Sequence, residues 1–145
     1  MTDYTNQWDK ETAGSNILGT DFDSKTNTTA VTLATVLDNS DALYTNIAME
    51  LVLGSITPAA GGYITVELFG SFDGTNYNDI LAGATDFSLS RSLTTSASAK
   101  RIVFGFDNLR PYKYKIVITN NAGVTTAASG NALKIQRFRE KGVGP

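Results

Sequence analysis

The alternation of apolar and polar side chains along residues 63–72 is the feature that most constrains this fold. The apolar residues Ile64, Val66, Leu68 and Phe72 share one side of this run, whereas Thr65 and Glu67 fall on the other. A period of two residues is typical of a β-strand that buries one face and leaves the other in contact with water. The chain must therefore supply a second layer against which this face can pack.

The same alternation recurs in segments that are separated by clusters of Gly, Asn, Asp and Ser. The other predicted strands are residues 29–37, 43–53, 77–81, 85–93, 100–106, 112–119 and 132–138. No window shows a useful helical period, so we predict an all-β fold of about eight strands, arranged as a jelly-roll-like antiparallel sandwich of two sheets. An immunoglobulin-like sandwich is the alternative, because one sequence does not define the strand order.

A length of 145 residues suits one domain, and we expect three parts. Residues 29–139 hold the predicted strands and form the β-sandwich domain. Residues 1–28 are polar and rich in turn residues, which predicts an extended N-terminal arm. Residues 140–145 are expected to be a solvated tail.

The chain has no histidine and no cysteine. These absences remove the commonest general base, the thiolate nucleophile and the commonest ligands of transition metals. The acidic residues lie mostly in turns, so a pair of catalytic carboxylates is not indicated. We therefore expect a protein that is not an enzyme, with no cofactor, no metal and no small-molecule substrate.

The charges are unevenly distributed along a chain whose net charge is −2. Residues 1–95 hold twelve acids and three bases, whereas residues 96–145 hold nine bases and two acids. This pattern predicts that late basic strands pair with early acidic ones in one sheet system, or that a dipolar surface fits other copies or an acidic partner. The negative total disfavours nucleic-acid binding.

No stretch approaches the roughly 20 apolar residues of a membrane-spanning helix, and the start lacks the pattern of a secretory signal. We therefore expect synthesis in the cytoplasm of the cell that makes the protein, and no membrane partner. The single tryptophan, Trp8, is costly to leave in water, so it is the first candidate for a contact with another molecule. The alternative is that the apolar residues of the arm lie on their own domain.

The turn after the 63–72 strand is the second candidate site. Asp73 and Asn76 offer oxygen ligands that could suit calcium together with Asp79, although a plain turn fits the spacing better. Tyr77 and Tyr112 could contribute to an aromatic platform for sugar stacking, or they could simply fill the sandwich. We name a possible ligand loop made of Asp73, Asn76, Tyr77 and Tyr112.

Two patterns resemble known families. The corner at residues 70–77, GSFDGTNY, resembles that of discoidin-type β-sandwich modules. Three further stretches, residues 58–62, 112–123 and 128–135, together resemble small virion structural proteins of tailed bacteriophages that decorate or cement the head. The second likeness extends from Leu43 to Arg139 and does not include the arm.

The phage resemblance implies a protein of the virion head surface that binds the major capsid protein, commonly as a homotrimer. On that basis the expected capsid or subunit contacts are Tyr4, Trp8, Ile17, Leu18, Arg137 and Arg139. Two alternatives from other classes stay open. One is a carbohydrate- or receptor-binding module of a phage fibre, and the other is a component of the tail or connector.

Overall fold

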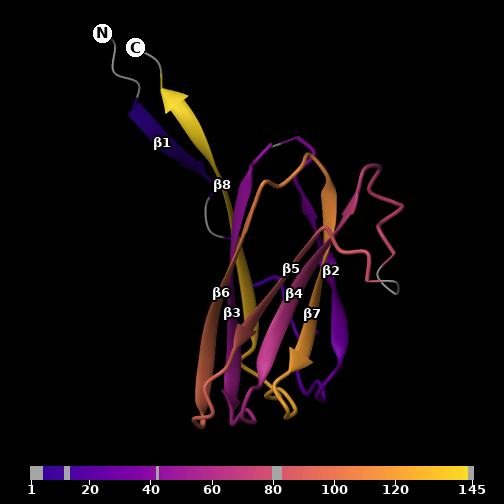
Figure 1. Ribbon diagram of the computed structural model, residues 1–145, viewed down its shortest axis with the longest axis vertical. Helices are drawn as coiled ribbons and strands as arrows, with labels where there is room; N and C mark the ends of the chain where they lie inside the picture. Colours follow the sequence, from indigo (N-terminus) through magenta and orange to yellow (C-terminus); the bar gives the residue numbers. More distant parts are fainter. Residues whose placement is uncertain (1–4, 12–13, 42, 80–82, 144–145) are drawn as a thin grey trace.

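The computed structural model describes residues 5–11, 14–41, 43–79 and 83–143, with the backbone alone for residues 5–8 and 141–143. The described residues form eight strands (Figure 1). They are β1 (Thr5–Lys10), β2 (Ala30–Asp38), β3 (Asn46–Ile56), β4 (Tyr63–Ser71), β5 (Phe87–Ser92), β6 (Ser98–Asp107), β7 (Lys113–Asn121) and β8 (Ala132–Val143). None of the described segments is a helix long and apolar enough to cross a membrane.

The strands build two four-stranded sheets with the orders β1-β8-β3-β6 and β2-β7-β4-β5, and every paired strand is antiparallel. The pairs β1:β8, β2:β7, β3:β6 and β4:β5 are nested in the sequence, as in one long hairpin that has been rolled up. Such nested pairing over two packed sheets defines a jelly roll. The prediction of an all-β, two-sheet sandwich is confirmed, and the jelly-roll order replaces the immunoglobulin-like alternative.

The core lies between the sheets, where the alternating faces meet. Along β3 every second side chain from Ile47 to Leu53 is fully buried, and along β4 Ile64, Val66 and Leu68 are buried in the same way, as predicted. The prediction was wrong for Phe72, whose side chain is 87% exposed. Strand β4 ends at Ser71, so the alternation that placed Phe72 on the core side no longer applies at that position.

Several strand boundaries differ from the predicted ones. Strand β3 begins three residues later than expected, because the backbone of Tyr44 bonds to the buried side chain of Asn39: Nδ2 donates to Tyr44 O, and Oδ1 accepts from Tyr44 N. Residues 77–79 lie outside any strand, and β6 already starts at Ser98, inside the predicted loop. Strand β8 continues to Val143, through residues that had been assigned to a solvated tail.

Residues 14–28 run along the sandwich and contribute to its core. Leu18 and Phe22 are both fully buried and belong to the same hydrophobic cluster as the strand residues. Thr126 holds this segment at two points, because its hydroxyl donates to Phe22 O (2.6 Å) and accepts from Lys25 N (2.8 Å). The inner half of the predicted arm is therefore an integral part of the domain.

The four ion pairs formed by the described residues all join an early acid to a late base. They are Asp9–Arg139, Glu11–Arg137, Asp38–Lys113 and Glu50–Arg101, with nitrogen–oxygen distances of 2.9–3.2 Å. The nested strand order explains this pattern, because it places the ends of the chain side by side. The uneven charge is thus neutralised, at least in part, within one subunit.

Candidate interaction surface

Strand β1 and the outer half of β8 extend beyond the body of the sandwich (Figure 1). Strand β8 pairs with β3 from residue 132 to 138, and with β1 from residue 138 to 143. Beyond Phe138, β1 is therefore the one described strand that pairs with β8, and this part of the sheet has two strands. We call this part, Thr5–Lys10 with residues 138–143, the ribbon. An isolated two-stranded ribbon is marginally stable in water, so the ribbon gains stability when another surface covers it.

The base of the ribbon is held by Arg137, which sequence analysis had named as a contact residue. Its guanidinium donates from Nε to Glu11 Oε1 (2.9 Å) and from Nη2 to Glu11 Oε2 (2.9 Å), while Nη1 donates to the carbonyl of Asp38. The side chain is only 17% exposed. A bidentate, half-buried pair of this kind fixes geometry better than an exposed single contact does.

Arg139 lies next to Arg137 along the same strand and pairs with Asp9 at 2.9 Å. Both guanidinium groups stand over the ring of Tyr44, at 5.3 Å for Arg137 and 5.7 Å for Arg139. These are cation–π distances. The two arginines thus orient the ribbon from within the chain, and each is paired with an acidic side chain.

The other predicted contact residues occupy different places. Tyr4 lies outside the described residues. Trp8 belongs to β1, opposite Glu140 of β8, and is part of the ribbon. Ile17 is half-buried in a hollow of about 290 Å³ that it shares with Glu11 and Arg137, whereas Leu18 is fully buried in the core. Trp8, Arg137 and Arg139 are therefore brought to one region, and Leu18 is not at the surface.

The Asp73 turn lies at the same end of the molecule as the ribbon's base, where the β4–β5 connection leaves the sandwich (Figure 1). The carboxylate of Asp73 accepts hydrogen bonds from Thr75 N and Asn76 N (both 2.8 Å), from Asn76 Nδ2 (2.7 Å) and from Ser71 Oγ (2.9 Å). These bonds make Asp73 the organiser of its own turn. The described residues contain no cluster of three or more acidic side chains that could hold a metal ion.

The hydrogen bonds to the carboxylate, first those from the Asn76 and Thr75 amides, hold the pKa of Asp73 well below its ordinary value of 3.8. A lowered native pKa stabilises the turn fully above the unfolded pKa, and this contribution disappears as the pH falls through the native value. We therefore expect the Thr75 and Asn76 amide NMR shifts to stay constant down to pH 4 and to move only below it. A midpoint at or above 3.8 would contradict the proposed bonding. Asp73→Asn should abolish the transition.

The predicted ligand loop is divided by the structure. Tyr77 lies under the ammonium group of Lys115, at 4.4 Å from the ring centre, whereas Tyr112 packs edge-on against Phe72 with ring centres 6.1 Å apart. Tyr112 and Asn76 line a pocket of about 360 Å³. The sequence did not indicate the other residues that line this pocket. The others are Gly70, Ser71, Phe72, Asn78, Asp86 and Arg110.

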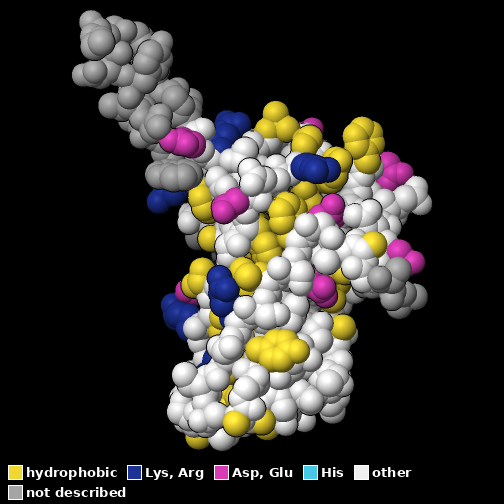
Figure 2. Space-filling model, viewed as in Figure 1, with side chains coloured by type: hydrophobic (Ala, Val, Ile, Leu, Met, Phe, Trp, Pro, Cys, Tyr) yellow, Lys and Arg dark blue, Asp and Glu magenta, His cyan; other side chains and the backbone are white. Residues whose placement is uncertain are grey.

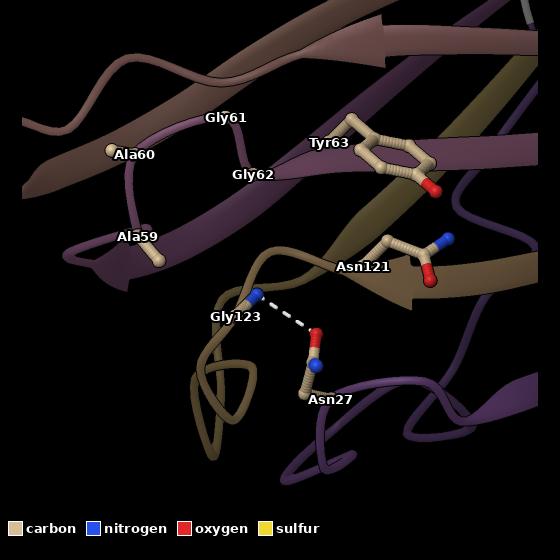
Figure 3. Close-up of a pocket in the computed structure, with 8 residues that line it drawn as sticks. All are labelled: Asn27, Ala59, Ala60, Gly61, Gly62, Tyr63, Asn121 and Gly123. Carbon is tan, nitrogen blue, oxygen red and sulfur yellow. Dashed lines mark hydrogen bonds between the residues drawn. The ribbon is translucent and has the colours of Figure 1, made fainter.

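A second hollow, of about 250 Å³, is shown in Figure 3. It lies where Tyr63 pairs with Asn121, at the end of the β4:β7 ladder opposite to Ser71. Gly123 N donates to Asn27 Oδ1 (2.8 Å), and Ala59 N donates to the carbonyl of Ala122 (2.8 Å). A Cβ atom at Gly123 would collide with Ala59, so these turns need small residues in order to meet. Close packing of two turns accounts for this hollow. At its rim, Tyr63 is 40% exposed.

The fold and these surfaces define an all-β sandwich domain with a projecting ribbon. No family model matches the chain, and no curated protein matches its sequence. Among solved structures it is similar to an arabinose-bound GH51 α-L-arabinofuranosidase, with 12% identity and a TM-score of 0.41. The match covers 92% of this chain but only 23% of the arabinofuranosidase chain.

Two further structures match over most of both chains. Desmodium yellow mottle tymovirus has 16% identity and a TM-score of 0.40, with 100% of this chain and 90% of that chain covered. The K1 cleaved adhesin domain of Lys-gingipain from Porphyromonas gingivalis W83 has 12% identity and a TM-score of 0.41, with 98% and 99% covered. These likenesses concern the β-sandwich fold alone.

Proposed function

We propose that this chain is a non-enzymatic structural protein of a tailed-phage virion that binds the outer surface of the head as a decoration or cement protein. Its partners would be the major capsid protein and two further copies of itself in a homotrimer. The motif resemblance between Leu43 and Arg139 supports this proposal. The observation that carries it is the ribbon, a two-stranded extension that needs a covering surface.

The ribbon is suited to binding through its backbone. Strand β1 is at the edge of its sheet, so one row of its amide and carbonyl groups is available to a strand of another chain. The Glu11–Arg137 pair fixes the base of the ribbon before binding, which lowers the entropy lost on association. On a capsid lattice many such weak contacts add up to firm attachment.

The test uses phage heads that lack this protein. We expect the full chain to cosediment with such heads, and a chain without residues 1–10 to lose this binding while it stays folded, because Glu11 and the core are kept. Phe72→Ala is the matched control, since Phe72 is exposed and lies outside the ribbon.

Two results would overturn the proposal. If the full chain does not bind heads, the assignment to the head surface is wrong. If the shortened chain binds equally well, the ribbon is not the attachment element. Sedimentation of the free chain tests the oligomeric state independently. We expect the mass of a homotrimer, three times the 15.5 kDa of one chain.

A further inference from the structure

Phe72 is far more exposed than any other large apolar residue among the side chains that the structure describes. Its side chain is 87% exposed, compared with 38–56% for the other exposed ones. The ring makes a T-shaped contact with Tyr112, with an interplanar angle of 72°, and both rings line the pocket of about 360 Å³. Hydrophobic side chains gather at this end of the molecule (Figure 2).

The polar wall of the pocket is fixed by Asp86. Its Oδ2 atom accepts hydrogen bonds from Gly70 N (2.5 Å) and Asn78 Nδ2 (2.8 Å). The described residues donate no bond to the other carboxylate oxygen, Oδ1. The other oxygen is therefore left to accept a bond from a ligand. A Cβ atom at Gly70 would lie 2.7 Å from Asp86 Oδ2 and 3.1 Å from the Tyr112 ring, so the glycine allows this close arrangement.

Arg110 also lines the pocket. Its backbone is anchored, because its N–H donates to the Tyr114 hydroxyl (2.9 Å) and its carbonyl accepts from Asn39 Nδ2 (3.0 Å). The side chain is exposed, and it takes part in none of the four ion pairs of the described residues. The pocket thus combines an aromatic face, a carboxylate acceptor, amide groups and a forked donor.

We propose that this pocket, which we call the Phe72 pocket, is a carbohydrate-binding site in which a pyranose ring stacks on Phe72. A sugar presents a flat set of C–H bonds to an aromatic face, while each of its hydroxyl groups both donates and accepts hydrogen bonds. Asp86 accepts from ring hydroxyls, and Arg110 donates to hydroxyl oxygens or to the carboxylate of an acidic sugar. The volume lies within the range of small-ligand sites.

Other stacking ligands fit this pocket less well. Single-stranded nucleic acid needs a positively charged groove along its backbone, whereas Asp73 and Asp86 place two carboxylates beside Phe72. A proline-rich peptide needs a groove lined by several aromatic rings rather than a pocket whose lining is mainly polar. The mixture of donors and acceptors therefore favours a polyhydroxylated ring.

The experiment is saturation-transfer NMR on the full chain with methyl glycosides of glucose, galactose, N-acetylglucosamine and glucuronic acid. We expect transfer from the protein to at least one of them, strongest at the C–H protons of one sugar face. Signal from neutral glycosides would assign a neutral sugar, and signal restricted to the glucuronide would assign an acidic one that pairs with Arg110.

Phe72→Ala should weaken the affinity at least about tenfold, because it removes the stacking surface. Tyr63→Ala is the matched control, since Tyr63 is an exposed aromatic residue at the opposite end of the sandwich, and it should leave binding unchanged. Absence of transfer to all four glycosides, or equal binding by Phe72→Ala, would overturn the proposal. Head attachment is measured separately and does not depend on this site.

Discussion

A chain that begins at residue 29 is expected to be unfolded under conditions in which a chain that begins at Glu11 is fully folded. The cause is the segment 14–28, which the sequence pattern assigned to an extended arm. Leu18 and Phe22 from this segment are completely buried in the core, and Thr126 binds the backbone on both sides of residue 24. Removing the segment opens the sandwich to water.

The expected size of the effect is large. Loss of a buried leucine or phenylalanine side chain costs about 2–5 kcal/mol each, whereas a domain of this size has a total free energy of unfolding of about 5–15 kcal/mol. Urea titration followed by circular dichroism, on the full chain and the two shortened chains, measures the difference. Equal midpoints for the full chain and the chain that begins at residue 29 would show that the segment is dispensable.

Asn120→Leu is expected to lower the free energy of unfolding by about 3 kcal/mol or more. The asparagine is fully buried, and its amide donates to the carbonyls of Lys25 (2.9 Å) and Val124 (2.8 Å), while its Oδ1 accepts from Ala122 N (3.0 Å). Leucine has a similar volume but leaves Val124 O and Ala122 N without these partners, whereas Lys25 O keeps its bond from Thr126 N (2.9 Å). Each buried group without a partner costs about 1–3 kcal/mol.

The matched control for this substitution is the neighbouring Asn121→Leu. Asn121 is half-buried at the rim of the hollow shown in Figure 3, and its replacement should change the free energy of unfolding by less than about 1 kcal/mol. Thermal and urea unfolding of both variants measure the difference. If the two substitutions have equal effects, the hydrogen bonds of Asn120 contribute little to stability.

The faces of the strands could be predicted from the sequence because alternation directly reports which side is buried. Ile64, Val66 and Leu68 follow this rule as long as β4 continues. The rule fails where a strand ends, since the end of β4 depends on the turn that Asp73 closes. Phe72 lies one residue beyond that end, and for this reason a side chain that is 87% exposed was assigned to the core.

Other features depend on contacts between residues that are distant in the sequence. Asp86 and Arg110 meet Phe72 only after β4, β5 and β7 have assembled, and no local pattern marks them. The buried asparagines also read as ordinary turn residues, because composition alone does not show that Asn120 faces inward. The ion pairs also join residues that are distant in the sequence, but they could be predicted. The acids are concentrated in residues 1–95 and the bases in residues 96–145, which indicated that early acids would pair with late bases.

The nested order of the strand pairs has a kinetic consequence. The β4:β5 pair joins neighbouring segments, whereas β1:β8 joins Thr5 to Val143, almost the full length of the chain. The entropy lost in closing a loop grows with loop length, so the outermost pair closes at low cost only after the inner pairs have shortened the path between its ends. Assembly should therefore proceed from the middle of the chain outward, at the slow rates typical of all-β topologies, with the ribbon formed last.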